Sequence, residues 1–181
     1  MTALTGSISA GKTKLMDVIA GWKAGGTTTG KIFLNGHEAD ELAIIRTTGY
    51  CERIDVHSES ITFREAITFG KFLRQDSKIL ASHKSATGEA CLDMLGLQIV
   101  GDKIVCGSSV EQLKRLWIAV ELTAQPRLMF LDEPTSGLDA RVAKIVADGL
   151  RRVADTGRTI VSKINQPSAE IFCVFDSLLL L

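Results

Sequence analysis

The chain has 181 residues, of which 45% are hydrophobic and 23% are charged, a composition typical of one globular domain that buries about 70% of its unfolded surface. Lysine and arginine number 21, as do aspartate and glutamate, so the basic excess of nucleic-acid-binding proteins is missing and we expect no nucleic acid partner. No apolar run reaches the roughly 18 residues of a membrane helix and no signal peptide precedes the first strand, so we expect the chain alone to be cytosolic.

The first predicted strand leads into a glycine-rich loop that is typical of phosphate binding. Residues 2–4 form a short apolar run, and a helical pattern begins near Lys12. Between them lies a match to G-x-x-x-x-G-K-[ST], made of Gly6, Ser7, Ile8, Ser9, Ala10, Gly11, Lys12 and Thr13. Such a loop points backbone N–H groups at phosphates, while its lysine contacts the terminal oxygens and its hydroxyl binds Mg²⁺. The alternative is a chance glycine-rich turn, but the strand-to-helix setting favours nucleotide binding.

Two short strands and a helical segment follow. Residues 31–34 predict a strand that ends in a tight turn at Asn35-Gly36, and residues 48–51 predict another strand. Thr62 and Glu65 have the spacing of a helix capping box, and helical periodicity continues to about Val105. We therefore expect a helical subdomain over residues 61–106, inserted into a core made of residues 1–60 and 107–181.

The last part of the chain alternates helices with strands. We expect helices over residues 112–122 and 141–154, and strands over residues 128–131, 159–162 and 177–181. This alternation predicts an α/β fold with a mostly parallel sheet, which together with the glycine-rich loop indicates a P-loop NTPase of the RecA-like type.

An acidic pair ends the apolar run at residues 128–131. A buried parallel strand delivers such carboxylates at its C-terminal edge, so Asp132 would hold the hydration shell of Mg²⁺ and Glu133 would orient and polarise the attacking water. On its own the pair would read as a helix cap or turn, but the phosphate loop upstream favours the catalytic interpretation.

The four cysteines show no metal-binding pattern. Cys51, Cys91, Cys106 and Cys173 are widely scattered, without a C-x-x-C pair or matching histidines. We expect them to be reduced core thiols, and we expect no zinc site.

Two further motifs carry a family resemblance. Ser136-Gly137-Leu138-Asp139 follows Glu133, and Ser108-Ser109-Val110-Glu111-Gln112 heads the helix that precedes the acidic strand. With the phosphate loop and the acidic pair, this order resembles an ABC transporter nucleotide-binding domain. The residues within these motifs are most similar to those of the G subfamily of pleiotropic drug resistance type, and specifically to those of the second of its two cassettes.

The resemblance implies a shared active site at a membrane. In that family two cassettes on the cytoplasmic side of the membrane close head to tail on two ATP molecules with Mg²⁺. Each ATP lies between the Walker motifs of one cassette and the signature loop of the other. Closure of the cassettes drives movement of the transmembrane domains. Residues 108–112 take the place of the signature, and residues 136–139 the place of the D-loop. Because Val110 and Glu111 replace two glycines and add bulk and negative charge, this signature is expected to serve a non-hydrolytic site.

Two departures from the family pattern weaken the expected catalysis. The family's switch histidine before Gln-Pro-Ser is Asn165 here, and an amide cannot carry positive charge or relay a proton. The Q-loop glutamine falls at Arg53, which offers no acceptor and repels a metal ion. Glu52 is either a substitute for that glutamine or an exposed loop acid.

The phosphate loop also departs from the family. Ile8 and Ser9 stand where Ser-Gly is usual, and a serine at a positive φ would cost roughly 1 kcal/mol over glycine. Lys14 stands where a second hydroxyl is usual, and it would either neutralise phosphate charge or point to solvent.

The resemblance further implies two parts that lie outside this chain. One is a set of strands before the phosphate-loop strand, with an aromatic residue that stacks on adenine, and the other is a membrane domain after the cassette. Tyr50 and Trp22 are the candidates to replace the aromatic residue, although a core position is the more common role for such residues. Two functions therefore compete. One is an ATPase cassette that works when paired with a partner, and the other is a nucleotide-binding or interaction module with little or no hydrolysis.

Overall fold

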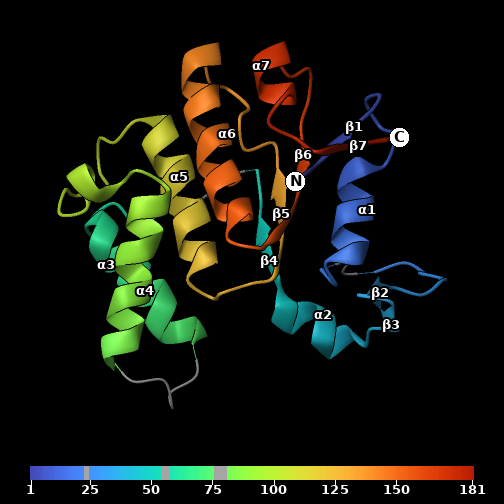
Figure 1. The fold of residues 1–181 in the computed structure, drawn as a ribbon, viewed down its shortest axis with the longest axis horizontal. Coiled ribbons are helices and arrows are strands. Elements are labelled where there is room, and N and C mark those ends of the chain that lie inside the picture. The colour runs from blue at the N-terminus through green and yellow to red at the C-terminus, as the bar shows by residue number, and fades with distance from the viewer. Residues whose placement is uncertain (23–24, 54–57, 76–80) are drawn as a thin grey trace.

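The computed structural model describes residues 1–22, 25–53, 58–75 and 81–181, and a parallel sheet lies at its centre (Figure 1). Its strands are β1 (Thr2–Thr5), β4 (Thr48–Cys51), β5 (Leu128–Asp132), β6 (Thr159–Lys163) and β7 (Ser177–Leu180). The order is β4-β5-β6-β1-β7, and every neighbouring pair is parallel. The predicted α/β fold of the P-loop NTPase type is confirmed. Within the described residues no helix is both long and apolar enough to cross a membrane.

Helices cover both faces of the sheet. Successive residues of a strand point to opposite faces, and on β5 Phe130 joins Met16 of α1 (Lys12–Ile19) in one apolar cluster. Met129 and Leu131 face the other way, into a larger cluster formed with α5 (Val110–Leu122) and α6 (Ala140–Asp155). The sheet is therefore buried on both sides, as an apolar parallel sheet requires.

The predicted strand at residues 31–34 is shorter than expected and lies outside the main sheet. β2 (Phe33–Leu34) pairs antiparallel with β3 (His37–Glu38) as a separate hairpin. The turn between them occurs where it was predicted, with Asn35 at φ 52° and Gly36 at φ 82°. Both residues of a type I′ turn need positive φ, and asparagine followed by glycine satisfies this.

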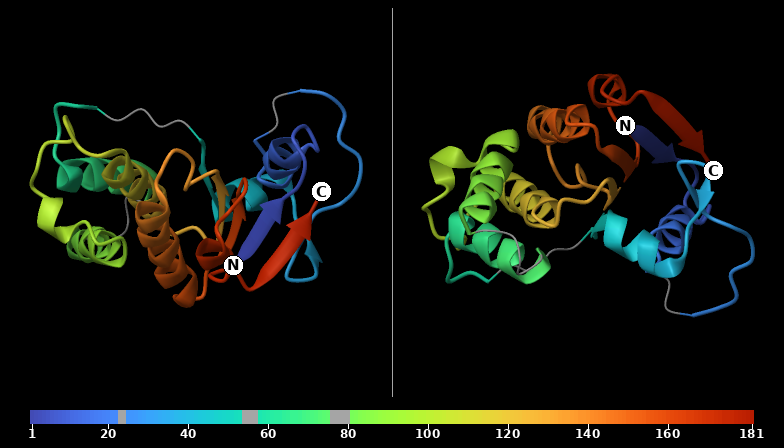
Figure 2. Two further views of the ribbon diagram at one scale, coloured as in Figure 1. Left: turned by 90° about the horizontal axis from the view of Figure 1, so that it is seen from above. Right: turned by 60° about the horizontal axis from the view of Figure 1, so that its bottom comes forward.

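The helical segment packs beside the sheet and not apart from it. α3 (Phe63–Arg74) begins at the predicted capping box, in which the side chain of Thr62 accepts from the backbone of Glu65. α4 (Ala81–Met94) and a short 3₁₀ helix (Gln98–Val100) complete the segment, while residues 76–80 of the predicted helical stretch lie outside the described residues. Both views in Figure 2 place α3 and α4 on the side away from β1 and β7. Phe63 and Leu92 belong to the same apolar cluster as Met129, so one core joins the segment to the sheet.

Three apolar residues of α3 do not face that core. Phe69, Phe72 and Leu73 fit the helical pattern in the sequence, yet they are 64%, 55% and 69% exposed. The buried side of α3 is formed by Phe63, Ala66, Ile67, Gly70 and Lys71. The helix therefore presents a second, outward-facing apolar surface.

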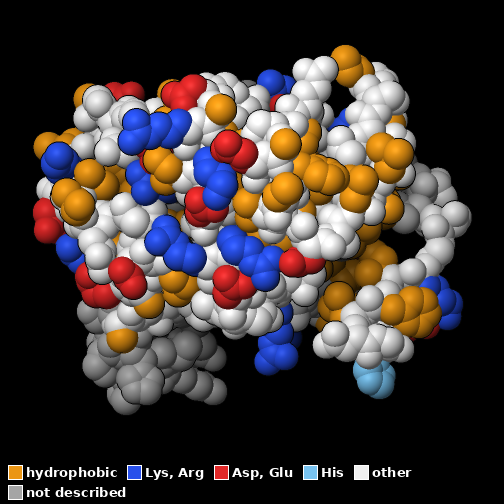
Figure 3. Space-filling model, turned by 45° about the horizontal axis from the view of Figure 1, so that its top comes forward, with side chains coloured by type: hydrophobic (Ala, Val, Ile, Leu, Met, Phe, Trp, Pro, Cys, Tyr) orange, Lys and Arg blue, Asp and Glu red, His pale blue; other side chains and the backbone are white. Residues whose placement is uncertain are grey.

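The structure corrects some sequence expectations. Cys51 and Cys91 are core thiols as expected, but Cys106 and Cys173 are exposed, because Cys106 lies in a turn before α5 and Cys173 caps the end of a short helix. Two short helices were not anticipated, α2 (Glu41–Thr47) and α7 (Ala169–Phe172). Their apolar patterns are too short to detect, although the N-caps Asp40 and Ser168 were visible signals. On the face drawn in Figure 3, basic and acidic side chains are interspersed, so that face carries no continuous basic stripe.

Candidate functional site

A polar cleft of about 480 Å³ lies at the carboxyl ends of β1, β5 and β6. Parallel sheets place the loops that follow their strands at one edge, and ligands of such sheets bind there. The cleft is lined by Ile8, Ser9, Ala10, Gly11, Lys12, Thr13, Lys14, Arg53, Glu133, Lys163 and Asn165. The structure therefore brings together the glycine-rich loop, the acid after β5, and the residues predicted at the switch and Q-loop positions.

The glycine-rich loop has the curled backbone of an anion cradle. Ser9 and Gly11 both have positive φ, at 69° and 90°, and Gly11 caps the start of α1. The Lys12 amine is buried and donates to the backbone oxygens of Gly6 and Ser7 at 3.0 and 2.7 Å. These bonds hold the lysine over the loop, where alternating left-handed and right-handed residues form a backbone nest.

Other residues of the loop differ in how they affect the cleft. Ile8 is 96% exposed and so does not crowd the cleft from inside. Lys14 is exposed and also lines the cleft, so its ammonium is available to an anion there. Gly6 cannot be replaced without movement, because a Cβ atom at this position would lie 2.0 Å from the backbone oxygen of Leu181.

The predicted metal ligands lie close together across the sheet. Thr13 is the second residue of α1 and Asp132 is the last residue of β5, and the Thr13 hydroxyl lies 3.4 Å from Asp132 Oδ2. Asp132 is buried, as is Glu133 next to it. Glu133 adopts φ 52°, an unfavourable region for a side-chain-bearing residue, and its backbone N–H donates to Lys163 at 3.0 Å. The chain therefore turns sharply after β5 and directs the Glu133 carboxylate into the cleft.

Lys163 is a site residue that the sequence did not reveal. β6 lies between β1 and β5, and Lys163 at its end is in register with both Asp132 and Leu4. Its Nζ lies 2.8 Å from Asp132 Oδ1, 3.1 Å from Glu133 Oε1 and 2.9 Å from the Thr13 hydroxyl. Burial lowers the pKa of Lys163, but the hydrogen bonds to Asp132 and Glu133 outweigh it and raise that pKa above its ordinary value.

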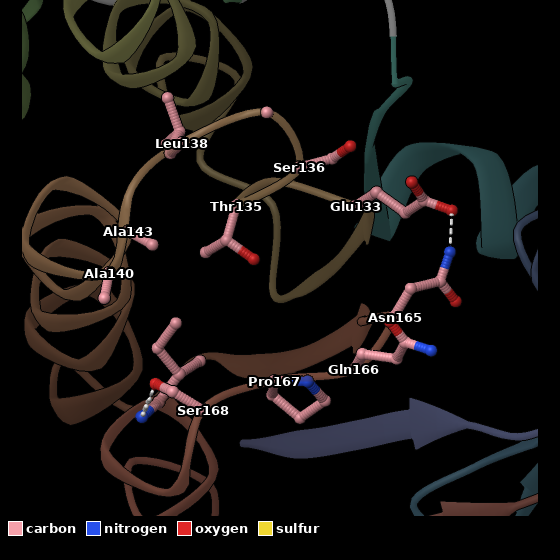
Figure 4. A pocket seen from close by; sticks show the side chains of 12 residues that line it. Glu133, Thr135, Ser136, Leu138, Ala140, Ala143, Asn165, Gln166, Pro167 and Ser168 are labelled. Atoms are coloured by element: carbon pink, nitrogen blue, oxygen red, sulfur yellow. Dashed lines mark hydrogen bonds between the residues drawn. The ribbon is translucent and has the colours of Figure 1, made fainter.

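The Glu133 carboxylate is surrounded by donors. Besides Lys163, Arg53 Nε lies 3.3 Å from Oε2, and the Asn165 side-chain amide donates to Oε1, as Figure 4 shows. Burial by itself raises the pKa of Glu133, but the hydrogen bond and charge of Lys163 and the charge of Arg53 leave that pKa below its usual value. The carboxylate is therefore ionised and paired on both oxygens.

The predicted D-loop lines a second cavity, of about 370 Å³, next to the first (Figure 4). Ser136, Gly137 and Leu138 line it from one side, and Asn165 and Glu133 belong to both cavities. Asp139 is occupied structurally, because its side chain accepts the Val142 N–H at 2.9 Å as the N-cap of α6.

The residues at the signature position lie outside the cleft and begin α5. Ser109 and Gln112 form a capping box, so the helix starts at Val110, two residues before the predicted start. Val110 is 56% exposed, whereas Glu111 forms an ion pair with Arg115 one turn later. That pairing reduces the negative charge that Glu111 adds to this surface. Ser108 precedes the cap, half-buried.

The two candidate aromatic residues stack on each other. Tyr50 is buried, and its hydroxyl donates to Asp17 at 2.7 Å. Trp22 is 53% exposed and stacks on Tyr50 with ring centroids 5.1 Å apart. Tyr50 is thus a core residue, and burial with the Asp17 hydrogen bond raises its pKa.

Comparison with known proteins agrees with this geometry. The sequence model described as "ABC transporter" matches residues 1–136. Over its whole length the chain is 47% identical to ABC transporter G family member 38 of Oryza sativa subsp. japonica and 48% identical to ABC transporter G family member 31 of Arabidopsis thaliana. It spans only 12% and 13% of the lengths of these relatives.

A solved structure shares the fold. It is the crystal structure of the ADP conformation of an ATP-binding cassette of an ABC transporter, with a TM-score of 0.82 and 18% sequence identity, covering all of this chain and 76% of that one. The sequence match, the parallel sheet and the glycine-rich loop at its edge lead to one conclusion, which is that this chain belongs to the ABC transporter family.

Proposed function

We propose that this chain is a nucleotide-binding cassette that holds ATP in the cleft after β1, and that its own hydrolysis of ATP is impaired. The observation that carries the proposal is the pairing of Glu133. An acid that polarises water must act as a base, and contacts with Lys163, Arg53 and Asn165 make this carboxylate a weaker base.

Binding is supported by the charge of the cleft. Lys12, Lys14, Arg53 and Lys163 line it, against the single acid Glu133. Together with the inward-facing N–H groups of a loop that precedes a helix, these side chains suit a polyphosphate. Lys12 is proposed to reach the terminal phosphates once it leaves the backbone oxygens of Gly6 and Ser7.

Impaired hydrolysis is supported at three positions. Phosphoryl transfer depends on positioning and on charge stabilisation. Both oxygens of Glu133 already have cationic or amide partners among the described residues. Asn165 uses its amide on Glu133 and cannot act as a charged switch residue. Arg53 places a cation at the expected Q-loop position, and Glu52 beside it is exposed.

Magnesium is the part of the sequence prediction that the local geometry does not support. Thr13 and Asp132 supply oxygen ligands of the right kind, but the Lys163 ammonium already lies within 2.9 Å of an oxygen of each. Mg²⁺ bound to these two oxygens would lie beside that ammonium. No step of the proposed function depends on a bound metal ion.

Partners are proposed from the exposed surfaces and the family. The second cavity around Ser136 and the exposed start of α5 at Val110 are the places where a second cassette would close. The outward apolar surface of Phe69, Phe72 and Leu73 lies beside a hollow of about 780 Å³ and would contact transmembrane domains. As the second cassette of a G-family transporter of pleiotropic drug resistance type, the chain would then lie at the cytoplasmic side of a membrane and assist transport.

Titration with a fluorescent ATP analogue, combined with a phosphate-release assay, tests this proposal. We expect saturable binding by the wild type, about 100-fold weaker binding by Lys12→Ala, and unchanged binding by Lys31→Ala, since Lys31 pairs with Glu38 away from the cleft. We expect phosphate release near background, with and without a partner cassette that has a Gly-Gly signature. Equal affinity of Lys12→Ala and wild type would place binding elsewhere, and steady turnover by the wild type would show that Glu133 is free to act.

A further inference from the structure

Lys163 takes a position that the metal ion was predicted to occupy. The three oxygens around its Nζ come from three different parts of the chain: the start of α1 (Thr13), the end of β5 (Asp132) and the residue after β5 (Glu133). The Thr13 hydroxyl accepts a hydrogen bond from this ammonium at 2.9 Å, and the Asp132 and Glu133 carboxylates form ion pairs with it at 2.8 and 3.1 Å. An ammonium at these distances fills the space between Thr13 and Asp132 that a metal ion bound to both oxygens would need.

The strand order makes this position a property of the fold. β6 separates β1 from β5, so the residue at its carboxyl end must project between the phosphate loop and the acidic pair. Lys163 pairs directly with Asp132 in the sheet register, and its side chain is 12% exposed. The lysine is therefore fixed at the site by the backbone and does not reach it from a loop.

Both carboxylates at the site are already paired with cations. Asp132 and Glu133 contribute two negative charges, and Lys163 and Arg53 contribute two positive charges at ion-pair distance. A divalent cation at the Thr13 and Asp132 oxygens would meet the repulsion of Lys163 and would leave that ammonium unpaired. Carboxylates that are already paired give a metal ion little attraction.

From this geometry we propose that Lys163 is a built-in cation that replaces Mg²⁺ between Thr13 and Asp132, so that the cassette binds a nucleoside triphosphate without a divalent metal. The inference rests on the proposed nucleotide binding and adds its metal requirement. Lys163 also lines the phosphate cleft, so the same ammonium is positioned to contact a phosphate oxygen. Lys163 therefore holds the Asp132 and Glu133 carboxylates in position and also contacts the bound nucleotide.

The test compares binding of a fluorescent ATP analogue in excess Mg²⁺ and in EDTA. We expect the wild-type dissociation constants in the two buffers to agree within about threefold. Lys163→Met keeps most of the unbranched side chain and removes the charge, so this variant should bind about tenfold or more weakly in EDTA and recover in Mg²⁺. Lys14→Met is the matched control, because Lys14 lines the same cleft without contacting the acidic pair, and it should weaken binding equally in both buffers.

A second measurement reads the metal directly. Electron paramagnetic resonance of Mn²⁺ added to the protein without nucleotide should show no protein-bound Mn²⁺ for the wild type and bound Mn²⁺ for Lys163→Met. Wild-type binding that needs Mg²⁺, or wild-type Mn²⁺ binding equal to that of the variant, would overturn the inference while leaving the proposed function standing. No wild-type binding in either buffer would overturn the proposed function and this inference with it. The wild-type comparison decides the matter even if Lys163→Met fails to fold.

Discussion

Glu133 shows how neighbours decide what a single residue can do. Its sequence position, after an apolar strand, is that of a catalytic acid. In the fold it turns through φ 52° and meets three donors, so the same carboxylate becomes the centre of a network of charges. A buried carboxylate with several charge-assisted hydrogen bonds stabilises the folded state more than it activates water.

This network predicts a pH-dependent contribution to stability. Because the pKa of Glu133 is lowered in the folded protein, its contribution is present above the unfolded-state pKa of about 4.3 and is lost as the pH falls through the lower folded value. We expect Glu133→Gln to reduce the free energy of unfolding at pH 7, and the difference from wild type to shrink in acid. Urea unfolding between pH 7 and pH 3 measures this, with Glu59→Gln at an exposed position as the control. A difference that stays constant over this range would contradict the prediction.

Ser9 gives a second prediction at the residue scale. It adopts φ 69°, where a Cβ atom is unfavourable, and glycine avoids that cost. Ser9→Gly should therefore raise the free energy of unfolding by about 0.5 kcal/mol, because the extra chain entropy of glycine cancels part of the strain that is relieved. Ser7→Gly in the same loop is the control, because Ser7 has no positive φ and should lose stability. Thermal unfolding of both variants decides the matter, and a loss in each would show that the Ser9 backbone is not strained.

Among the elements, α3 is the one whose start the sequence predicts best. Its capping box satisfies two N–H groups that the first turn leaves open, with Thr62 N donating to Glu65 Oε2 at 2.8 Å and Glu65 N donating to the Thr62 hydroxyl at 3.2 Å. Local chemistry alone determines this, so no tertiary contact was needed to foresee it.

Removing the cap should loosen α3 by a measurable amount. Thr62→Ala is expected to lower the free energy of unfolding by about 1 kcal/mol, whereas Thr62→Ser keeps the hydroxyl and should cost much less. Urea unfolding followed by circular dichroism gives both values. Equal losses in the two variants would attribute the effect to the Thr62 methyl group and not to the cap.

At the scale of the whole molecule, one apolar core joins the helical segment to the sheet. Residues of α3, α4, α5 and α6 share it with residues of β5 and β6. A shared core couples the two parts, and single cores of this size unfold cooperatively. The helical segment at residues 61–106 is therefore proposed to be a subdomain in sequence only, not an independent folding unit.

The two tryptophans of the chain provide the test. Trp117 packs against the shared core from α5, while Trp22 stacks on Tyr50 at the other face of the sheet. In Trp22→Phe and Trp117→Phe variants, each remaining fluorescence signal should report the same urea midpoint as circular dichroism in that variant. Separate midpoints would show that the two parts unfold independently.

The features that could be predicted from the sequence alone are those that depend on residues close together in the chain. The phosphate loop, the acidic pair, the turn at Asn35-Gly36 and the cap at Thr62 are local patterns whose chemistry can be recognised in a few residues. The alternation of apolar strands with helices also predicted the parallel sheet, because helical connections between strands cover both of its faces.

The contacts between side chains at the site depend on the tertiary structure. Lys163 is an unremarkable basic residue at the end of a strand until β6 is placed between β1 and β5, because strand order is not a local property. The exposure of Phe69 on α3 and the pairing of Arg53 with Glu133 likewise depend on how elements pack across the molecule. The sequence alone predicts an ATPase site, whereas the long-range contacts of the fold pair Asp132 and Glu133 with basic side chains.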